Sequence, residues 1–396
     1  MNSSAPTLTN ELDVTISDVI RYHLGLGRAV ALWRLPQQSK IQVAICTQGL
    51  VMPNDFVLET SEQGFLMAPF HPQGQKYFLA ADHLFVFEKN KLIKASKVTE
   101  LDLGNLLKNN ETPSSHEQIS FHAAPYSPVH QPEYQQLVRK SIEFIEKGVF
   151  EKIVPARSKD VELYKPIDPL HLFESLCTKY PHAFVSLVSS TETGTWVGAT
   201  PEVLVSVSED QIFKTVALAG TKSFTEGMNL KSVAWTQKEI EEQAMVSRYI
   251  INCLKKLRVR EYTEHGPRTS VAGNLVHLKT DYEVDMKAIS FPQFATHMLK
   301  LLHPTSAVCG MPLEESLAFL TSQESFDRAF YTGYLGPVGL SEGSHLYVNL
   351  RCIQMFEKVI RFYAGAGVTA DSDPETEWQE TEMKMNTMAS VVFHSL

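Results

Sequence analysis

The chain has 396 residues, 43% of them hydrophobic, which is enough to bury one large core or two ordinary ones. Its formal net charge of −9 argues against nucleic acid or an anionic membrane surface as a partner. The five cysteines lie far apart without metal-ligand spacing, which argues against a disulfide framework or a zinc site. With no signal-like start and no apolar run near the roughly 20 residues of a membrane span, we expect a cytoplasmic protein.

The first hundred residues predict a series of strands. Short runs rich in β-branched and aromatic residues alternate with turn-formers, as in AVALWRLP, IQVAICTQGL, GFLMAPF and YFLAADHLFVFE. Residues 105–131 are polar and rich in proline and serine, which is typical of a connector. We therefore expect a sheet-rich N-terminal part over residues 1–125 and a catalytic domain over residues 126–396.

The second part predicts helices and strands in alternation. A helix is expected from Pro132 to Gly148, and another begins at Asp168. The runs AFVSLVS, TWVGA, EVLVSV and IFKTVAL predict consecutive strands, followed by long helices over 235–257 and 374–392. Residues 344–356 alternate cleanly and predict one strand with Arg351 on its less apolar face. Meandering strands with inserted helices favour an α+β fold, with large antiparallel sheets packed as a sandwich and helices around them.

Two pairs of glutamates have the spacing of a helix face. Glu239 and Glu242 lie three residues apart, and Glu377 and Glu380 repeat that spacing. Two such pairs could hold a hard cation such as Mg²⁺ with oxygen ligands. Most glutamates at this spacing simply form a solvated helix face, so spacing alone does not establish a metal site.

Glycine-rich segments and one arginine suggest an anion site. VALAGT (216–221) and YAGAGVT (363–369) place small residues where backbone amides could receive a carboxylate, although tight turns would need them too. Arg351 could donate two parallel hydrogen bonds to a carboxylate, or pair with a structural acid.

Taken together, these segments resemble the chorismate-utilising enzymes, the family of isochorismate, salicylate, anthranilate and aminodeoxychorismate synthases. The resemblance runs from about Tyr134 to Met388 and consists of ten motifs in family order. They are EKIVPAR (151–157), GATPE (198–202), ALAGT (217–221), KEIEEQ (238–243), VHLKT (276–280), HPTSAVCGMP (303–312), FDRAFYTGYLGPVG (326–339), VNLR (348–351), GAGV (365–368) and SDPETEWQETEMK (372–384).

The resemblance implies a Mg²⁺ cofactor and a role for each matching position. It implies direct metal ligands at Glu242 and Glu380, with Glu239 and Glu377 reaching the metal through water. It implies Lys152 as a general base and Glu202 as a general acid with a raised pKa. The positions expected to contact chorismate are Gly220, Thr221, His277, Ala307, Tyr331, Arg351, Gly365, Ala366, Gly367 and Lys384.

Particular residues indicate which reaction the resemblance implies. Lys152 stands where water-adding members have lysine and ammonia-adding members typically have glutamine, which cannot act as a base. Ala219 replaces the covalent lysine of many aminodeoxychorismate synthases. Ala307 and Val308 resemble the members that stop at isochorismate. The implied activity is therefore isochorismate synthase; the alternatives are a salicylate synthase with additional pyruvate-lyase activity and a non-catalytic chorismate-binding paralogue.

The implied enzyme acts on chorismate as a monomer without a glutaminase subunit, and its product could feed menaquinone, siderophore or salicylate synthesis. Two positions depart from the family pattern. Pro155 replaces a common leucine and requires an edge or a bulge in its strand. Gln243 stands where the family often has a histidine. This replacement affects how the preceding residue, the proposed metal ligand Glu242, is oriented.

Overall fold

The computed structural model describes residues 14–50, 52, 56–99, 102, 104, 106, 128–225, 227–272 and 275–394. Within that part of the chain, none of the helices combines the length and apolar character needed to traverse a lipid bilayer. The boundary predicted at residue 125 and most of the predicted connector lie outside the described residues.

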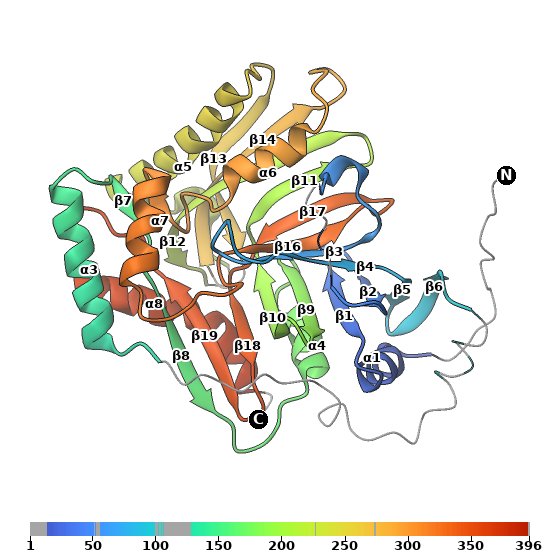
Figure 1. The fold of residues 1–396 in the computed structure, drawn as a ribbon. Helices are drawn as coiled ribbons and strands as arrows, with labels where there is room; N and C mark the ends of the chain where they lie inside the picture. The colour runs from blue at the N-terminus through green and yellow to red at the C-terminus, as the bar shows by residue number, and fades with distance from the viewer. Residues whose placement is uncertain are drawn as a thin grey trace.

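A nine-stranded antiparallel sheet forms one half of the molecule (Figure 1). Its strands, in spatial order, are β6 (Lys91–Ser96), β5 (His83–Glu88), β2 (Lys40–Cys46), β1 (Ala29–Arg34), β9 (Phe184–Ser190), β10 (Gly194–Thr200), β18 (Cys352–Met355), β19 (Val359–Gly365) and β8 (Ala156–Glu162).

An eight-stranded antiparallel sheet forms the other half. Its strands, in spatial order, are β13 (Thr263–Ala272), β14 (Leu275–Asp285), β12 (Ile212–Ser223), β11 (Val203–Ser208), β17 (Gly343–Val348), β16 (Tyr334–Val338), β3 (Gly64–Ala68) and β4 (Tyr77–Ala80). Strands from before residue 100 enter both sheets, since β1 pairs with β9 and β3 pairs with β16.

Helices cover the outer faces of the two sheets, and a small two-stranded sheet of β7 (Lys152–Ile153) and β15 (Gly310–Met311) lies at their side (Figure 1). The helices are α1 (Ile16–Gly25), α3 (Gln131–Glu146), α4 (Pro169–Lys179), α5 (Gln237–Lys256), α6 (Phe294–Leu302), α7 (Leu313–Gln323) and α8 (Pro374–Val392), with 3₁₀ turns at η1 (Leu58–Thr60) and η3 (Leu230–Ser232). The predicted α+β sandwich is thus confirmed, as are helices near 132–147, 168–180, 235–257 and 374–392.

The order of side chains along the central strands explains the layering. In β9, Phe184 and Val188 join the core between the two sheets, whereas Val185 and Leu187 join the core beneath the helices. Side chains alternate between the two faces of a strand, so the two faces of β9 contribute to two different cores. The ring of Phe184 stacks on Tyr347 from the opposite sheet with 4.1 Å between centroids, which fixes the two sheets face to face.

One predicted strand is wrong in a way that matters for the site. Residues 344–356 do not form a single strand, because β17 ends at Val348 in one sheet and β18 begins at Cys352 in the other. Arg351 has a φ of 49°, in the left-handed region, and so lies in the crossover and not on a strand face. Apolar and polar residues still alternate across this break, because the strands on both sides of it are buried.

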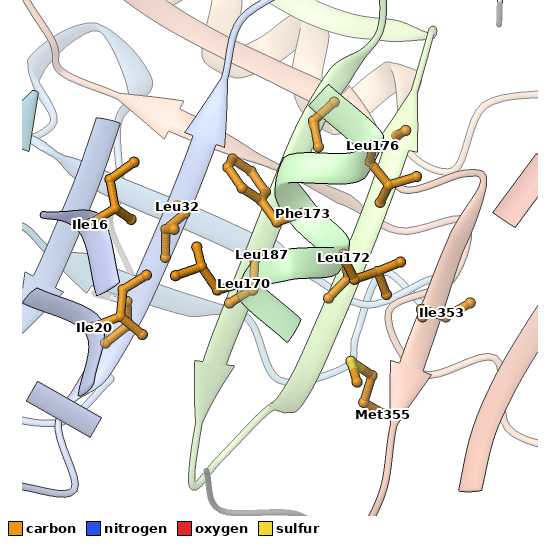
Figure 2. Packing of buried hydrophobic residues seen from close by; sticks show 14 of the residues in the cluster. Ile16, Ile20, Leu32, Leu170, Leu172, Phe173, Leu176, Leu187, Ile353 and Met355 are labelled. Atoms are coloured by element: carbon orange, nitrogen blue, oxygen red, sulfur yellow. The ribbon is translucent and has the colours of Figure 1, made fainter. Parts of the chain in front are cut away.

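The core under α4 gives a test of this packing. Phe173 has no exposed surface and packs among Leu172, Leu176 and Leu187 (Figure 2). We expect Phe173→Ala to lower the free energy of unfolding by about 3–5 kcal/mol, because it removes buried apolar contacts and leaves a cavity. Denaturant unfolding measures this, with Tyr164→Ala as a control, since Tyr164 is fully exposed and should change stability by less than about 0.5 kcal/mol. Equal effects of the two substitutions would contradict the packing.

Candidate active site

Two adjacent crossovers carry the chain between the sheets and form one wall of a pocket. One leads from β10 into β11 and the other from β17 into β18. They are bonded together, since the Val348 amide donates to the carbonyl of Glu202 at 2.9 Å and the Ala199 amide donates to that of Arg351 at 3.0 Å. The pocket beside them is lined by residues of both crossovers, among them Glu202 and Arg351.

Most of the predicted site residues converge on this pocket although they come from distant parts of the chain. Those that line it are Glu202, Gly220, Thr221, Glu242, His277, Ala307, Tyr331, Arg351, Gly365, Gly367 and Lys384. Lys152 and Ala366 are buried beside it, and Glu239, Glu377 and Glu380 lie further out on α5 and α8.

Glu202 is a buried carboxyl group at the first crossover, with 5% of its surface exposed. Burial raises its pKa from 4.5 to about 7, against the opposing effect of nearby Arg351, Lys152 and Lys384. Around neutral pH this group can therefore hold a proton and release it, as an acid catalyst must.

Arg351 and Tyr331 present polar groups to the pocket. The guanidinium of Arg351 makes no hydrogen bond or ion pair with any residue the structure describes, and burial lowers its pKa. The Tyr331 ring stacks on Tyr363 with centroids 5.2 Å apart, and Tyr363 stacks in turn on Trp196. A partly buried guanidinium with no ion-pair partner among the described residues favours an anionic ligand.

His277 faces the same pocket from β14 as a neutral imidazole. Its Nδ1 lies 2.8 Å from the carbonyl of Gly220, which as an acceptor places the ring proton on Nδ1. Burial lowers its pKa to about 3, and its Nε2 is buried without a hydrogen-bond partner in the described structure. Gly220 itself has a φ of +65° at a register shift of β12, and Thr221 follows it into the pocket wall.

Lys152 forms a buried ion pair at the edge of the pocket. Its Nζ donates to Oε1 of Glu242 at 2.6 Å, and its side chain is 2% exposed. Burial acts to raise the pKa of Glu242, but Lys152 and Lys384 bring it below its ordinary value. A Cβ on Gly367 would lie 3.0 Å from both Lys152 Cε and Glu242 Oε1, so a larger residue would displace this pair.

Gly365, the other glycine of the GAGV motif, lies too close to a neighbouring backbone segment to carry a side chain. A Cβ on Gly365 would lie 2.9 Å from the carbonyl oxygen of Pro155, and the Ala366 amide donates to that same oxygen at 3.2 Å. Pro155 falls between β7 and β8, outside either strand, as its missing N–H requires. Ala366 is fully buried behind the two glycines.

The remaining glutamates on α5 and α8 also contact lysines. Glu239 lies 3.1 Å from Lys222 and completes the capping box of α5 with Thr236. The other contacts are Glu377 with Lys238 at 3.0 Å and Glu380 with Lys384 at 2.5 Å. Gln243 anchors α5 to the sheet by donating to the Ala217 carbonyl and to Thr280.

These carboxylates fit a cation site by their chemistry. Burial acts to lower the pKa of Lys238, but the negative charges of Glu377, Glu380 and Glu242 raise it above its ordinary value, so carboxylates of both helices act on one ammonium group. Oε2 of Glu377 is buried and has no partner in the described structure, which leaves an oxygen acceptor available. In this lysine-paired arrangement, no three acidic, histidine or cysteine side chains among the described residues are grouped closely enough to hold a metal ion.

Sequence reasoning missed the lysine partners Lys222 and Lys238 and the pocket residues Val154, Leu218, Thr332 and Leu350. Lys238 stands directly before Glu239, but its partner Glu377 is 139 residues away, and no local pattern predicts such a contact.

Comparison with known proteins identifies the class that this fold and pocket define. The family model "Chorismate binding enzyme" matches residues 69–393. The chain therefore belongs to the family of chorismate-binding enzymes.

Three relatives illustrate the range of this family. The isochorismate synthase DhbC of Bacillus subtilis (strain 168) is 32% identical over 285 residues, which are 69% of this chain and 71% of that protein. The structure of MenF, the menaquinone-specific isochorismate synthase of Escherichia coli, aligns with a TM-score of 0.75 and 19% identity over 94% of this chain and 90% of its own. Anthranilate synthase component I of Streptococcus pneumoniae TIGR4 aligns with a TM-score of 0.67 and 18% identity over 91% and 92% of the two chains. The two structural likenesses show a shared fold.

The ionisation of Glu202 is directly measurable. Its protonated carboxyl band, isolated as the infrared difference between the native protein and Glu202→Gln, should titrate at about pH 7. Since the folded-state pKa is raised, this group favours the folded state below its ordinary pKa and loses that contribution as pH rises through about 7. Titration of this band near the ordinary value of about 4.3 would contradict the burial that we describe.

Proposed function

We propose that this protein is an isochorismate synthase, which converts chorismate into isochorismate by adding water at ring carbon C2 and expelling the C4 hydroxyl. One observation carries the proposal: Glu202, with a pKa of about 7, shares a pocket with Arg351, a cation that forms no ion pair with any described residue. Chorismate fits this pocket, because it carries carboxylates that can pair with Arg351 and a hydroxyl group that Glu202 can protonate. Relatives that are named isochorismate synthases support it further.

Arg351 and Tyr331 hold the pyruvyl carboxylate in this proposal. A guanidinium can donate two parallel hydrogen bonds to a carboxylate, which fixes the orientation as well as the charge of the ligand. The backbone around Gly365, Ala366 and Gly367 and the ammonium of Lys384 extend the anion-binding wall. Gly220, Thr221 and His277 contact the ring, where the unpartnered Nε2 of His277 can accept a hydrogen bond from a hydroxyl group.

Lys152 and Glu202 carry out the proton transfers. Neutral Lys152 takes a proton from a water that attacks C2, while protonated Glu202 donates to the hydroxyl that leaves C4 as water. The ring double bond shifts between the two carbons, so one water is consumed and one released. The raised pKa of Glu202 supports its role, because an acid with a pKa near the working pH is protonated when needed and releases its proton readily.

Glu242 and Glu380 would hold a Mg²⁺ ion directly, with Glu239 and Glu377 bound to it through water. When bound, the ion supplies positive charge that orients the ring carboxylate and stabilises its charge. The contact of Glu377 with Lys238 on α5 and the buried, unpartnered Oε2 of Glu377 in the described structure support a cation site between α5 and α8.

Ala307 and Val308 form an aliphatic part of the pocket wall. We propose that they favour release of isochorismate over elimination of pyruvate, because elimination depends on how the pyruvyl arm is oriented in the pocket.

Product analysis tests this function. Purified protein incubated with chorismate and Mg²⁺ should yield isochorismate alone, and removal of divalent metal by a chelator should stop the conversion until Mg²⁺ is restored. Salicylate with pyruvate would indicate the lyase-competent alternative. Absence of any conversion, with chorismate binding retained, would indicate a non-catalytic chorismate-binding protein.

Lys152→Gln identifies the base in the same assay. The variant should bind chorismate but form isochorismate about 10²- to 10⁴-fold more slowly, the usual contribution of a general base. Lys214→Gln is the matched control, because Lys214 also pairs with a glutamate but lies on the exposed side of β12 and should leave turnover unchanged. A Lys152→Gln variant with normal turnover would remove the proposed base.

A further inference from the structure

A second buried ion pair lies directly behind the pocket. Arg328, in the segment between α7 and β16, donates from Nε to Oε2 of Glu324 at 2.7 Å and from Nη2 to Oε1 at 2.5 Å. The two side chains are 2% and 5% exposed. Neither lines the pocket, so neither would touch a ligand bound there.

The remaining donors of Arg328 reach the backs of three pocket segments. Nη2 donates to the carbonyl of Val154 at 2.7 Å. Nη1 donates to the carbonyl of Val308 at 2.9 Å and to Oγ1 of Thr332 at 3.2 Å. Val154, Val308 and Thr332 all line the pocket, so one side chain connects three walls that are distant in sequence.

Glu324 completes the connection on the segment that carries Lys152. Its Oε1 accepts a hydrogen bond from the Ala156 amide at 2.8 Å. Arg328 and Glu324 therefore bond the backbone on both sides of Pro155, the residue that cannot donate to a strand ladder. The ion pair holds the chain at the break between β7 and β8, two residues after Lys152.

The hydrogen bond from Arg328 to Thr332 supports an unfavourable backbone conformation. Thr332 has a φ of 60°, which a β-branched residue rarely adopts. The turn is held by the Thr332 amide, which donates to the Asn349 carbonyl at 2.9 Å, and by the Arg328 contact to its hydroxyl. This turn presents Tyr331 to the pocket.

We propose that Arg328 and Glu324 are positioning residues, which set the places of Lys152, Val308 and Tyr331 relative to one another. The proposal rests on the proposed function for the roles of Lys152 and Tyr331. A guanidinium is required because its planar group bonds several acceptors in fixed directions, whereas the compact ammonium of a lysine cannot reach all of them.

Arg328→Lys tests the proposal against a matched control, Arg361→Lys. Arg361 forms an equally buried pair, with Nε 2.6 Å and Nη2 2.7 Å from the two oxygens of Asp160. That pair joins β19 to β8 with side chains 5% and 3% exposed, and neither residue lines the pocket. Both substitutions keep the charge and break a two-pronged contact, so a purely structural effect should be common to both.

We expect Arg328→Lys to lower kcat for isochorismate formation about 10- to 100-fold with a smaller change in KM, because catalysis is more sensitive than binding to displaced groups. Arg361→Lys should keep both constants near those of the unmodified protein. Hydrogen–deuterium exchange of the unliganded proteins should increase in peptides covering 152–156, 307–309 and 330–333 for Arg328→Lys only. Glu324→Gln, which keeps the size of the side chain and loses its charge, should change kcat and exchange in the same direction if Arg328→Lys does not fold.

Equal kcat and KM in Arg328→Lys and Arg361→Lys would overturn the proposal, as would identical exchange in the three peptides. If the unmodified protein forms no isochorismate, the proposed function fails, and the exchange comparison alone decides whether the ion pair positions these segments.

Discussion

The contact between Lys152 and Glu242 is the constraint around which the site is built. A buried charge must be paired, and these two compensate each other at 2.6 Å between β7 and α5. Gly367 lies beside the pair, where a Cβ would come within 3.0 Å of both side chains. The pair also links the two proposed roles, because Lys152 must lose its proton before it can act as a base, which leaves the negative charge of Glu242 to be balanced by another cation.

The sandwich places this pair beside the crossovers between its sheets. Both crossovers pass from one sheet to the other beside the pocket, where their side chains are shielded from water. That position explains why burial raises the pKa of Glu202, and it places the guanidinium of Arg351 where no described residue forms an ion pair with it. The left-handed φ of Arg351 belongs to the same feature, since strained backbone is common where a site demands a particular direction.

Sequence patterns correctly predicted the features that depend on neighbouring residues, such as where a helix begins and ends. The helix after Asp168 begins at Pro169 with the aspartate as its cap, and α8 spans the predicted residues 374–392. The break at Arg351 was missed because alternation continues through it when strands on both sides are buried. The site residues were predictable only through the order of family motifs, since spacing left the glutamate pairs ambiguous. Lysine partners such as Lys238 were not predictable, because tertiary structure alone brings them to their glutamates.

The central claim is that the new hydroxyl at C2 comes from water. Conversion of unlabelled chorismate in ¹⁸O-labelled water, followed by mass spectrometry of the product, measures this directly. The account predicts one ¹⁸O atom in each isochorismate, located at the C2 hydroxyl, with the original C4 oxygen lost to solvent. Isochorismate that retains the original oxygen would mean that the hydroxyl migrates within the molecule, and it would contradict the roles proposed for Lys152 and Glu202.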